Sequence, residues 1–162
     1  MKKFAIQIGI LVTVIFGALY FSYNQSMLNQ VLPINQNLPS RQIKVGNTIL
    51  DIEVADTTVT RSKGLSGREK LSENSGMLFI FPDTKQYQFW MKGMKFPLDF
   101  IFIREGKVVD LLKNIPNPES NVLDSKLVIY QPTVPIDMML EVNFGFVDKQ
   151  NIIIGDPVAL VK

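Results

Sequence analysis

The chain has 162 residues, with 17 Lys or Arg, 15 Asp or Glu, and neither cysteine nor histidine, so its formal net charge is +2. This length fits one modest domain, and a hydrophobic content of 46% suits a packed core and is too high for a disordered chain. The missing cysteine excludes disulfides and thiol chemistry, while the missing histidine removes the usual general base and the commonest zinc ligand. We therefore expect neither a metal ion nor a cofactor.

The N-terminal segment has the length and composition of a membrane-spanning helix. Residues 4–23 carry no charge and, as a helix, would rise about 30 Å, the thickness of a bilayer core. Two lysines precede them and no other charge occurs before Arg41, so the positive-inside rule places the N-terminus in the cytoplasm. A cleaved signal peptide is the alternative, but the run ends in aromatic residues without a small-residue exit. We predict an uncleaved signal anchor at 1–23, inserted through 4–23 into the lipid bilayer of the cell membrane.

The rest of the chain divides into a linker and one domain. Residues 24–40 are rich in Asn and Gln and uncharged, which is typical of a linker, and the domain spans 41–162. The predicted anchor places this domain outside the cytoplasm. Setting aside Lys2 and Lys3 leaves 15 basic against 15 acidic residues, so the domain is formally neutral. Because phosphate binding usually leaves a basic face, we expect no nucleic-acid partner.

The domain opens with strand and turn signals. Residues 42–45 and 48–55 flank Gly46-Asn47, and this pattern predicts a β-hairpin because both turn residues tolerate positive φ. Asp56-Thr57-Thr58 provides helix caps for a short helix that ends near Gly64. A capping-box match at Ser66-Gly67-Arg68-Glu69 predicts a second short helix.

The central block, residues 76–103, holds the only tryptophan and most of the phenylalanines, and it predicts three short core strands. Further strands are expected over 107–115, 127–130, 136–142, 152–154 and 158–161, with a helical turn over 144–150. Many short strands with few helices indicate a mostly β (α+β) fold. We predict a small antiparallel β-barrel or sandwich with two or three short helices, preceded by one N-terminal transmembrane helix.

A series of motifs runs through the domain in a fixed order. They are Arg61-x-x-Gly64-Leu65-x-x-Arg68-x-x-Leu71, Gly76-Met77-Leu78-Phe79, Phe89-Trp90-Met91, Pro97-Leu98-Asp99, Phe102, Leu140-Glu141 with Gly145, and Gly155-Asp156. Over residues 50–162 the chain resembles the family catalogued as domain of unknown function 192. The resemblance implies a small, mostly β, barrel-like domain, often behind a signal or anchor, with no established activity. The chain departs from the family pattern at Ser66, where Met is usual, and at Gly93-Met94, where Asn-Thr is usual.

Asp99 is the first candidate for chemistry. Alternation places Leu98, Phe100 and Phe102 on one face of a strand and Asp99, Ile101 and Ile103 on the other. A carboxylate among apolar residues needs a partner, because an unpaired buried charge is very costly. The candidate partners are Arg61, Arg68, Lys95 and the Trp90 indole N–H. We favour a structural ion pair that fixes residues 57–71 to the sheet, with a ligand or proton-transfer site as the alternative.

The other candidates are carboxylates and one aromatic side chain. Glu141 alternates with two apolar neighbours and so points to solvent, or it forms with Asp99 a carboxylate pair of the kind used in glycoside hydrolysis. Asp156 in Gly-Asp-Pro is interpreted as a turn residue. The alternative is that Asp156, Asp99 and Glu141 together form a hard-cation site. Trp90 reads as core, or as the exposed rim of a sugar or peptide groove.

We therefore expect a membrane-tethered, extracytoplasmic binding or accessory module that recognises a small ligand, glycan or peptide. An enzyme is the less favoured interpretation. The candidate ligand-binding residues are Arg61, Arg68, Trp90 and Asp99. The alternative function is a carboxylate-dependent hydrolase that acts on cell-envelope glycan, with Asp99 and Glu141 as catalytic candidates.

Overall fold

The computed structural model describes residues 40–119 and 122–161. The predicted anchor at 1–23 and all but the last residue of the predicted linker lie outside these residues, so both stay predictions. Within the described residues, no helix is long and apolar enough to cross a bilayer.

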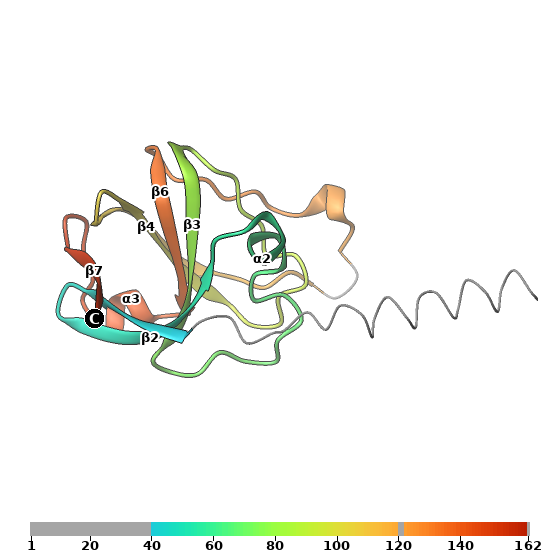
Figure 1. Cartoon of the computed structure of the whole chain (residues 1–162). Coiled ribbons are helices and arrows are strands. Elements are labelled where there is room, and N and C mark those ends of the chain that lie inside the picture. The colour runs from blue at the N-terminus through green and yellow to red at the C-terminus, as the bar shows by residue number, and fades with distance from the viewer. Residues whose placement is uncertain (1–39, 120–121, 162) are drawn as a thin grey trace, which may run out of the picture. The chain divides into compact units, whose positions relative to one another are not determined.

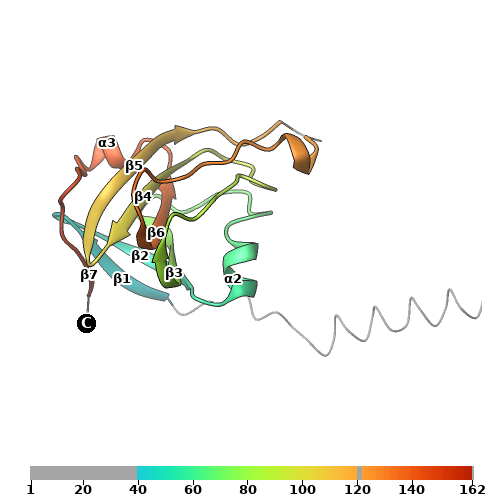
Figure 2. The ribbon, with the colours of Figure 1, turned by 90° about the horizontal axis from the view of Figure 1, so that it is seen from above.

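Seven strands form one sheet in the order β5-β4-β6-β3-β2-β1-β7. Their bounds are β1 Ser40–Val45, β2 Thr48–Ala55, β3 Ser75–Lys85, β4 Leu98–Arg104, β5 Lys107–Ile115, β6 Ile136–Asn143 and β7 Val158–Val161. Figures 1 and 2 show that the sheet curls strongly. At one end its two edges meet, because Val108 N–H donates to the Asp156 carbonyl at 3.0 Å and Val158 N–H to the Gly106 carbonyl at 2.8 Å. The mostly β prediction is confirmed, and the sheet is a curled half-barrel.

The all-antiparallel prediction is wrong at one pair of strands. β2 and β3 run parallel, with Val54 opposite Leu78. The sequence predicts no parallel pair, because it lacks helices long enough for the usual parallel crossover. Residues 56–74 nevertheless make the crossover, with a single short helix, α2 (Thr58–Lys63), and irregular chain after it. A parallel connection needs about a dozen residues or more, and they need not be helical.

The predicted first helix is confirmed and the second is wrong. Thr57 caps α2 with a capping box, since its side chain accepts from Thr60 N–H at 3.1 Å and the Thr60 side chain accepts from Thr57 N–H at 3.0 Å. After Gly64 the chain turns, Gly67 adopts φ +81°, and the Arg68 side chain is held by Glu53 of β2. The other helices within residues 40–119 and 122–161 are a 3₁₀ turn, η1 (Asp124–Lys126), and α3 (Phe146–Lys149), and α3 confirms the predicted helical turn over 144–150.

The alternation predicted along β4 is confirmed, and it separates two cores. Ile101 and Ile103 join an aliphatic core to which all seven strands contribute, so this core lies inside the curl. Leu98, Phe100 and Phe102 join an aromatic core on the other side of the sheet. Side chains from residues 65–71, residues 87–96 and Tyr130 cover this outer core, and Figures 1 and 2 both place α2 beside β3. A central strand buried on both faces forces each of its side chains into one core or the other.

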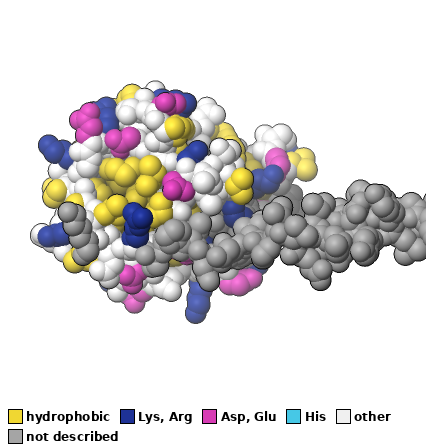
Figure 3. All heavy atoms as spheres, in the orientation of Figure 1, with side chains coloured by type: hydrophobic (Ala, Val, Ile, Leu, Met, Phe, Trp, Pro, Cys, Tyr) yellow, Lys and Arg dark blue, Asp and Glu magenta, His cyan; other side chains and the backbone are white. Residues whose placement is uncertain are grey.

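The face drawn in Figure 3 gathers hydrophobic side chains near its centre, with side chains of both charges scattered around them. Neither sign of charge forms a continuous region on this face. The mixture agrees with the formally neutral balance of the domain.

Candidate functional site

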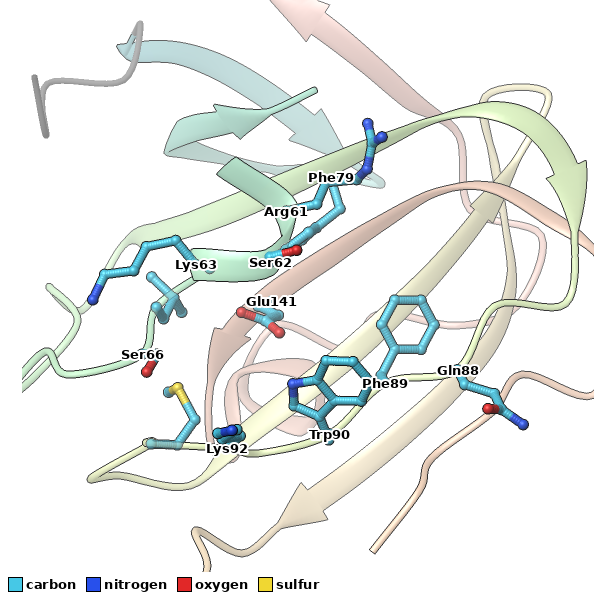
Figure 4. A pocket seen from close by; sticks show the side chains of 13 residues that line it. Arg61, Ser62, Lys63, Ser66, Phe79, Gln88, Phe89, Trp90, Lys92 and Glu141 are labelled. Carbon is cyan, nitrogen blue, oxygen red and sulfur yellow. The ribbon is translucent and has the colours of Figure 1, made fainter. Parts of the chain in front are cut away.

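A pocket lies on the outer side of the sheet, over the aromatic core. One wall is the end of α2 and the turn after it, residues 61–66, and the other wall comes from residues 88–94. Phe79 of β3 and Glu141 of β6 line it between these walls, and the enclosed volume is about 180 Å³. Figure 4 shows the Glu141 carboxyl in the middle of the pocket, between the α2 wall and Trp90.

Both walls are anchored by apolar side chains. Gly64 ends α2 with φ +48°, and the next residue, Leu65, is buried in the aromatic core. On the other wall, Met91 and Met94 are buried in the same core, and Phe89 pairs with Tyr130 through two backbone hydrogen bonds of 2.9 Å. The pocket is therefore held open by packed segments that come from distant parts of the sequence.

Glu141 is the buried polar group of this pocket. Its neighbours in β6, Leu140 and Val142, belong to the aliphatic core, so Glu141 points to the opposite face, where Met77 and Phe100 lie beside it on the adjacent strands. Only 8% of Glu141 is exposed. The prediction that it points to solvent is wrong, because the segments around α2 and Trp90 cover this face of the sheet.

The Glu141 carboxyl makes no side-chain hydrogen bond or ion pair with the described residues, and burial raises its pKa from 4.5 to about 8. Desolvation disfavours the charged form of a carboxyl group, which explains the direction of the change. At neutral pH the side chain is therefore mostly a neutral acid. A neutral carboxyl donates one hydrogen bond through its O–H and accepts others.

The cations around the pocket differ in how they are held. The Arg61 guanidinium donates to the carbonyls of Asp56 at 2.5 Å and Ile80 at 2.8 Å, and it turns away from Glu141 in Figure 4. Arg61 thus ties α2 to β3. Lys92 forms an ion pair with Asp124. Lys63 is exposed, takes part in none of the six ion pairs in the described part of the chain, and extends outward in Figure 4.

Trp90 is the exposed one of the three aromatic residues that line the pocket. Half of it is exposed, whereas its neighbour Met91 is buried. Phe89 packs its ring 6.0 Å from that of Phe100 and 5.7 Å from that of Phe102, as part of the aromatic core. The interpretation of Trp90 as an exposed rim residue therefore fits the structure better than its interpretation as core.

Asp99 lies elsewhere, fully buried on the inner side of the sheet. Its carboxylate accepts N–H groups from Asn114 at 2.8 Å and from Val147, in the first turn of α3, at 3.0 Å. None of the ion pairs in the described residues involves Asp99, so the ion-pair prediction is wrong. The two backbone amides replace the expected cation, and Asp99 does not line the pocket.

Arg68 also lies outside the pocket. It pairs with Glu53 through both carboxylate oxygens, one of them 2.8 Å from Arg68 Nη2, and this carboxylate raises the pKa of the guanidinium. Both side chains are about one-third exposed or less. The bidentate pair holds the crossover segment against β2, which is a structural role for this candidate ligand-binding residue.

The three carboxylates considered together in the sequence are not brought together. Asp99 and Glu141 are on adjacent strands, but Asp99 is opposite Val142 and Glu141 is opposite Phe100, so the two side chains point to opposite faces of the sheet. Asp156 closes its own turn, as predicted, by accepting Ile153 N–H at 2.9 Å. In the described parts of the chain, no group of three potential metal-binding side chains is placed to hold an ion.

The two departures from the family pattern meet at one end of the pocket. A Cβ atom on residue 93 would overlap Ser66 Oγ, and Gly93 has φ +69°. The Gly93 carbonyl also accepts Gly67 N–H at 2.9 Å. The resemblance to the family marks Ser66 and Gly93 as unusual, but it gives no sign that they touch, since 26 other residues separate them along the chain.

Together, the fold and the site define a small half-barrel domain with a surface pocket built around one buried carboxyl-bearing side chain that has no partner among the described residues. The chain belongs to the DUF192 family, described as uncharacterized ACR, whose model matches residues 41–160.

Two solved structures are similar to it. One is a protein described as a candidate transcription regulator from Sinorhizobium meliloti 1021, with 27% identity and a TM-score of 0.67 over 76% of this chain and 95% of that one. The other is a protein of unknown function from Novosphingobium aromaticivorans DSM 12444, with 26% identity and a TM-score of 0.68 over 79% of this chain and 89% of that one. No curated protein matches the chain significantly.

Proposed function

We propose that this protein is a membrane-tethered, extracytoplasmic binding or accessory module, and that the pocket around Glu141 binds a small ligand, a glycan unit or part of a peptide. The observation that carries the binding role is the Glu141 side chain, which is buried as a residue, has no hydrogen-bond partner among the described residues, and presents its carboxyl to the pocket. Polar groups with so little exposure nearly always have a hydrogen-bond partner, and a ligand that enters the pocket can supply to Glu141 a bond that the described residues do not.

The size and lining of the pocket support a small recognised group. Its volume of about 180 Å³ is below the roughly 300–1,000 Å³ of pockets that enclose drug-sized ligands. One sugar unit or one amino-acid side chain suits such a space. The exposed Trp90 ring offers a flat apolar surface at the edge, and an aromatic ring gives much contact area with little loss of conformational freedom.

Binding is favoured over glycan hydrolysis by the placement of the carboxylates. Glycoside hydrolysis usually needs two carboxyl groups that flank one bond, about 5–10 Å apart with access to the same substrate. Asp99 and Glu141 point to opposite faces of the sheet, and backbone amides occupy Asp99. The single accessible carboxyl therefore supports recognition of a ligand.

The binding proposal is tested with the only tryptophan in the chain, Trp90, as the reporter. A panel of monosaccharides and dipeptides should include members that change Trp90 fluorescence in a saturable way in the full chain in detergent micelles. Glu141→Leu, which removes the polar group and narrows the pocket, should abolish that change, while the exposed Asp83→Asn should leave it intact. If no member of the panel changes the fluorescence, the proposed binding role is wrong.

The tether is tested separately, because it depends on the uncharged residues 4–23. A reporter enzyme fused after Lys162 should be active only outside the cytoplasm, and the protein should stay with membranes after a high-salt wash. A cytoplasmic reporter signal would contradict the proposed orientation. Release of a soluble form without residues 1–23 would instead show a cleaved signal peptide.

A further inference from the structure

The charges around Glu141 narrow the class of ligand. We infer that the pocket takes an acidic sugar unit, a pyranose ring that carries a carboxylate, with its ring against Trp90, its hydroxyl groups toward Glu141 and its carboxylate toward Lys63. This inference rests on the proposed binding function and names the ligand class for the same pocket.

The first argument is the charge balance of the lining. Among the described residues that line the pocket, three are cations, Arg61, Lys63 and Lys92, and Glu141 is the only acid. Arg61 is fixed to two backbone carbonyls and Lys92 is paired with Asp124, whereas Lys63 at the rim has no ion pair with any residue that the structure describes. A cationic ligand would enter against this excess of positive charge, whereas an anionic group gains an attraction at the rim.

The second argument is the polar chemistry inside the pocket. A neutral Glu141 carboxyl offers one O–H donor and acceptor oxygens, and the hydroxyl groups of Ser62 and Ser66 also line the pocket. Sugar hydroxyl groups both donate and accept, so they match side chains of this kind. A simple carboxylate ion would use the lysine at the rim and would leave the Glu141 carboxyl unpartnered.

The third argument is the position of Trp90 opposite the α2 wall in Figure 4. Half of Trp90 is exposed, and its buried neighbour Met91 fixes the backbone that carries the indole ring. A pyranose ring has an apolar face of C–H groups, and an exposed aromatic ring buries such a face well. The acidic sugar thus uses the three kinds of group that the pocket offers: cation, hydroxyl partners and aromatic surface.

The test compares three sugars that share one ring size and differ in charge: glucuronate, glucose and glucosamine. Each is titrated into the full chain in micelles of a polyoxyethylene detergent, which carries no sugar head group, and Trp90 fluorescence is measured at pH 6.5. We expect a saturable change with glucuronate at the lowest concentration, and a weaker response to glucose and glucosamine. Acetate, which has the charge without the ring, should produce no saturable change.

The pH dependence of binding gives a signature that depends on Glu141. The charged groups that line the pocket with it are Arg61 and Lys63 from α2 and Lys92 from the opposite wall. As Glu141 ionises above about pH 8, it loses its donor and repels the anion, so glucuronate affinity should fall by up to about tenfold per pH unit. Glu141→Gln keeps a neutral donor at every pH, so it should retain binding at pH 6.5 and lose the pH dependence.

A second variant tests the cation. Lys63→Gln should weaken glucuronate binding by about fivefold, the upper range for an exposed charge pair, and should leave glucose binding unchanged. Lys70→Gln is the matched control, because Lys70 is exposed on the same crossover and does not line the pocket. Its glucuronate affinity should equal that of the unchanged protein.

The outcomes separate this inference from the binding function. Tighter binding of glucosamine that disappears in Glu141→Gln would show a cation site, and equal binding of glucose and glucuronate would show a neutral-sugar site. Either result overturns the acidic-sugar inference and leaves the binding function standing, as does acetate binding as well as glucuronate. If no sugar and no peptide of the panel changes Trp90 fluorescence, both proposals are wrong.

Discussion

Two carboxylates on adjacent strands of one sheet have opposite surroundings. Asp99 of β4 points into the curl, is fully buried, and accepts two backbone N–H groups. Glu141 of β6 points to the outer face, is also buried, and has no partner among the described residues. Both side chains sit among apolar neighbours, so burial alone does not separate a structural carboxylate from a functional one. What separates the two carboxylates is whether the side chain has a hydrogen-bond partner within the protein.

The difference has an energetic meaning. A buried carboxylate that accepts N–H groups recovers much of the hydration that it loses on folding, and it connects the segments that carry those groups. Asp99 in this way joins β4 to the end of β5 and the start of α3. Glu141 recovers nothing within the described structure, and its raised pKa records that cost. Residues that lower stability in the empty protein are common at functional sites.

The substitution with the largest expected effect on the free energy of unfolding is Glu141→Gln. A carboxyl whose pKa is raised on folding binds its proton more tightly in the folded state, so its contribution to the free energy of unfolding declines as pH rises from about 4.5 to about 8. The slope is about 1.4 kcal/mol per pH unit, and Glu141→Gln should therefore stabilise the domain by about 4 kcal/mol at pH 8. Urea unfolding of residues 37–162, which include all seven strands of the described sheet, measures this change.

The control for Glu141→Gln is the unchanged protein. The free energy of unfolding of both proteins is measured from pH 4 to pH 9, and the difference between them is followed. Contributions to the free energy of unfolding that the two proteins share cancel in this difference. It should be small near pH 4, grow up to pH 8 and level off above that pH. A difference that is flat across this range would mean that Glu141 titrates normally and that its pocket is well hydrated. The contrast with Asp99 would then lose its energetic basis.

The second effect is the loss of the Asp99 hydrogen bonds. Asp99→Asn leaves one acceptor oxygen and introduces an NH₂ group that faces a backbone N–H, so at least one buried donor loses its partner. We expect the free energy of unfolding to fall by about 3 kcal/mol, since a hydrogen bond to a charged group contributes roughly 1.5–3 kcal/mol. The measurement is urea unfolding of residues 37–162 at pH 7, followed by circular dichroism.

Asp83→Asn is the matched control for Asp99→Asn, because the Asp83 side chain is 68% exposed in a long contact with Lys85. Its effect should stay within about 0.5 kcal/mol. If Asp99→Asn proved as mild as this control, the two backbone hydrogen bonds would not account for the burial of Asp99, and the structural assignment would have to be abandoned.

For Asp99 and Glu141, the sequence predicted which neighbours share a face of the sheet better than it predicted hydrogen-bond partners or solvent exposure. Alternation correctly placed Asp99 on the same face as Ile101 and on the opposite face from Phe100, because successive side chains of a strand point to opposite faces of the sheet. The partners of Asp99 are backbone amides, which every residue has, so no residue type in the sequence identifies them. Glu141 was assigned to solvent because the cover over its face comes from segments about 50–80 residues away in the chain.

The pocket walls show the same limit. Thr57 and Gly64 correctly predicted the bounds of α2, since a helix cap depends on a few neighbouring residues. The capping-box match at Ser66 failed because Gly67 adopts a positive φ and Arg68 pairs with Glu53, which is a long-range contact. Local chemistry therefore predicted the helix that lines the pocket, while the turn that completes the wall depends on tertiary packing.

A third, smaller effect tests the fit between the walls. Gly93→Ala places a Cβ atom against Ser66 Oγ in a backbone with φ +69°, and should lower the free energy of unfolding by about 2 kcal/mol. Ser66→Ala removes the overlapping oxygen, so the double variant should recover the steric part of this loss. Gly145→Ala is the control, because it has a similar φ, +75°, and open space around its Cβ position. Additive effects of the two changes at 66 and 93 would show that the walls do not touch.

The substitution with the smallest expected effect on the free energy of unfolding is Trp90→Ala. Its effect decides whether Trp90 belongs to the pocket or to the core. Truncating a buried aromatic residue typically costs about 3–5 kcal/mol, which we expect for Phe100→Ala, since Phe100 is fully buried in the aromatic core. Half of Trp90 is exposed, so Trp90→Ala should lower the free energy of unfolding of residues 37–162 by less than about 1 kcal/mol. Circular dichroism is the measurement, because the variant has no tryptophan left to report unfolding. A loss comparable to that of Phe100→Ala would assign Trp90 to the core, and an aromatic ring needed for folding would no longer be evidence for a ligand beside Glu141.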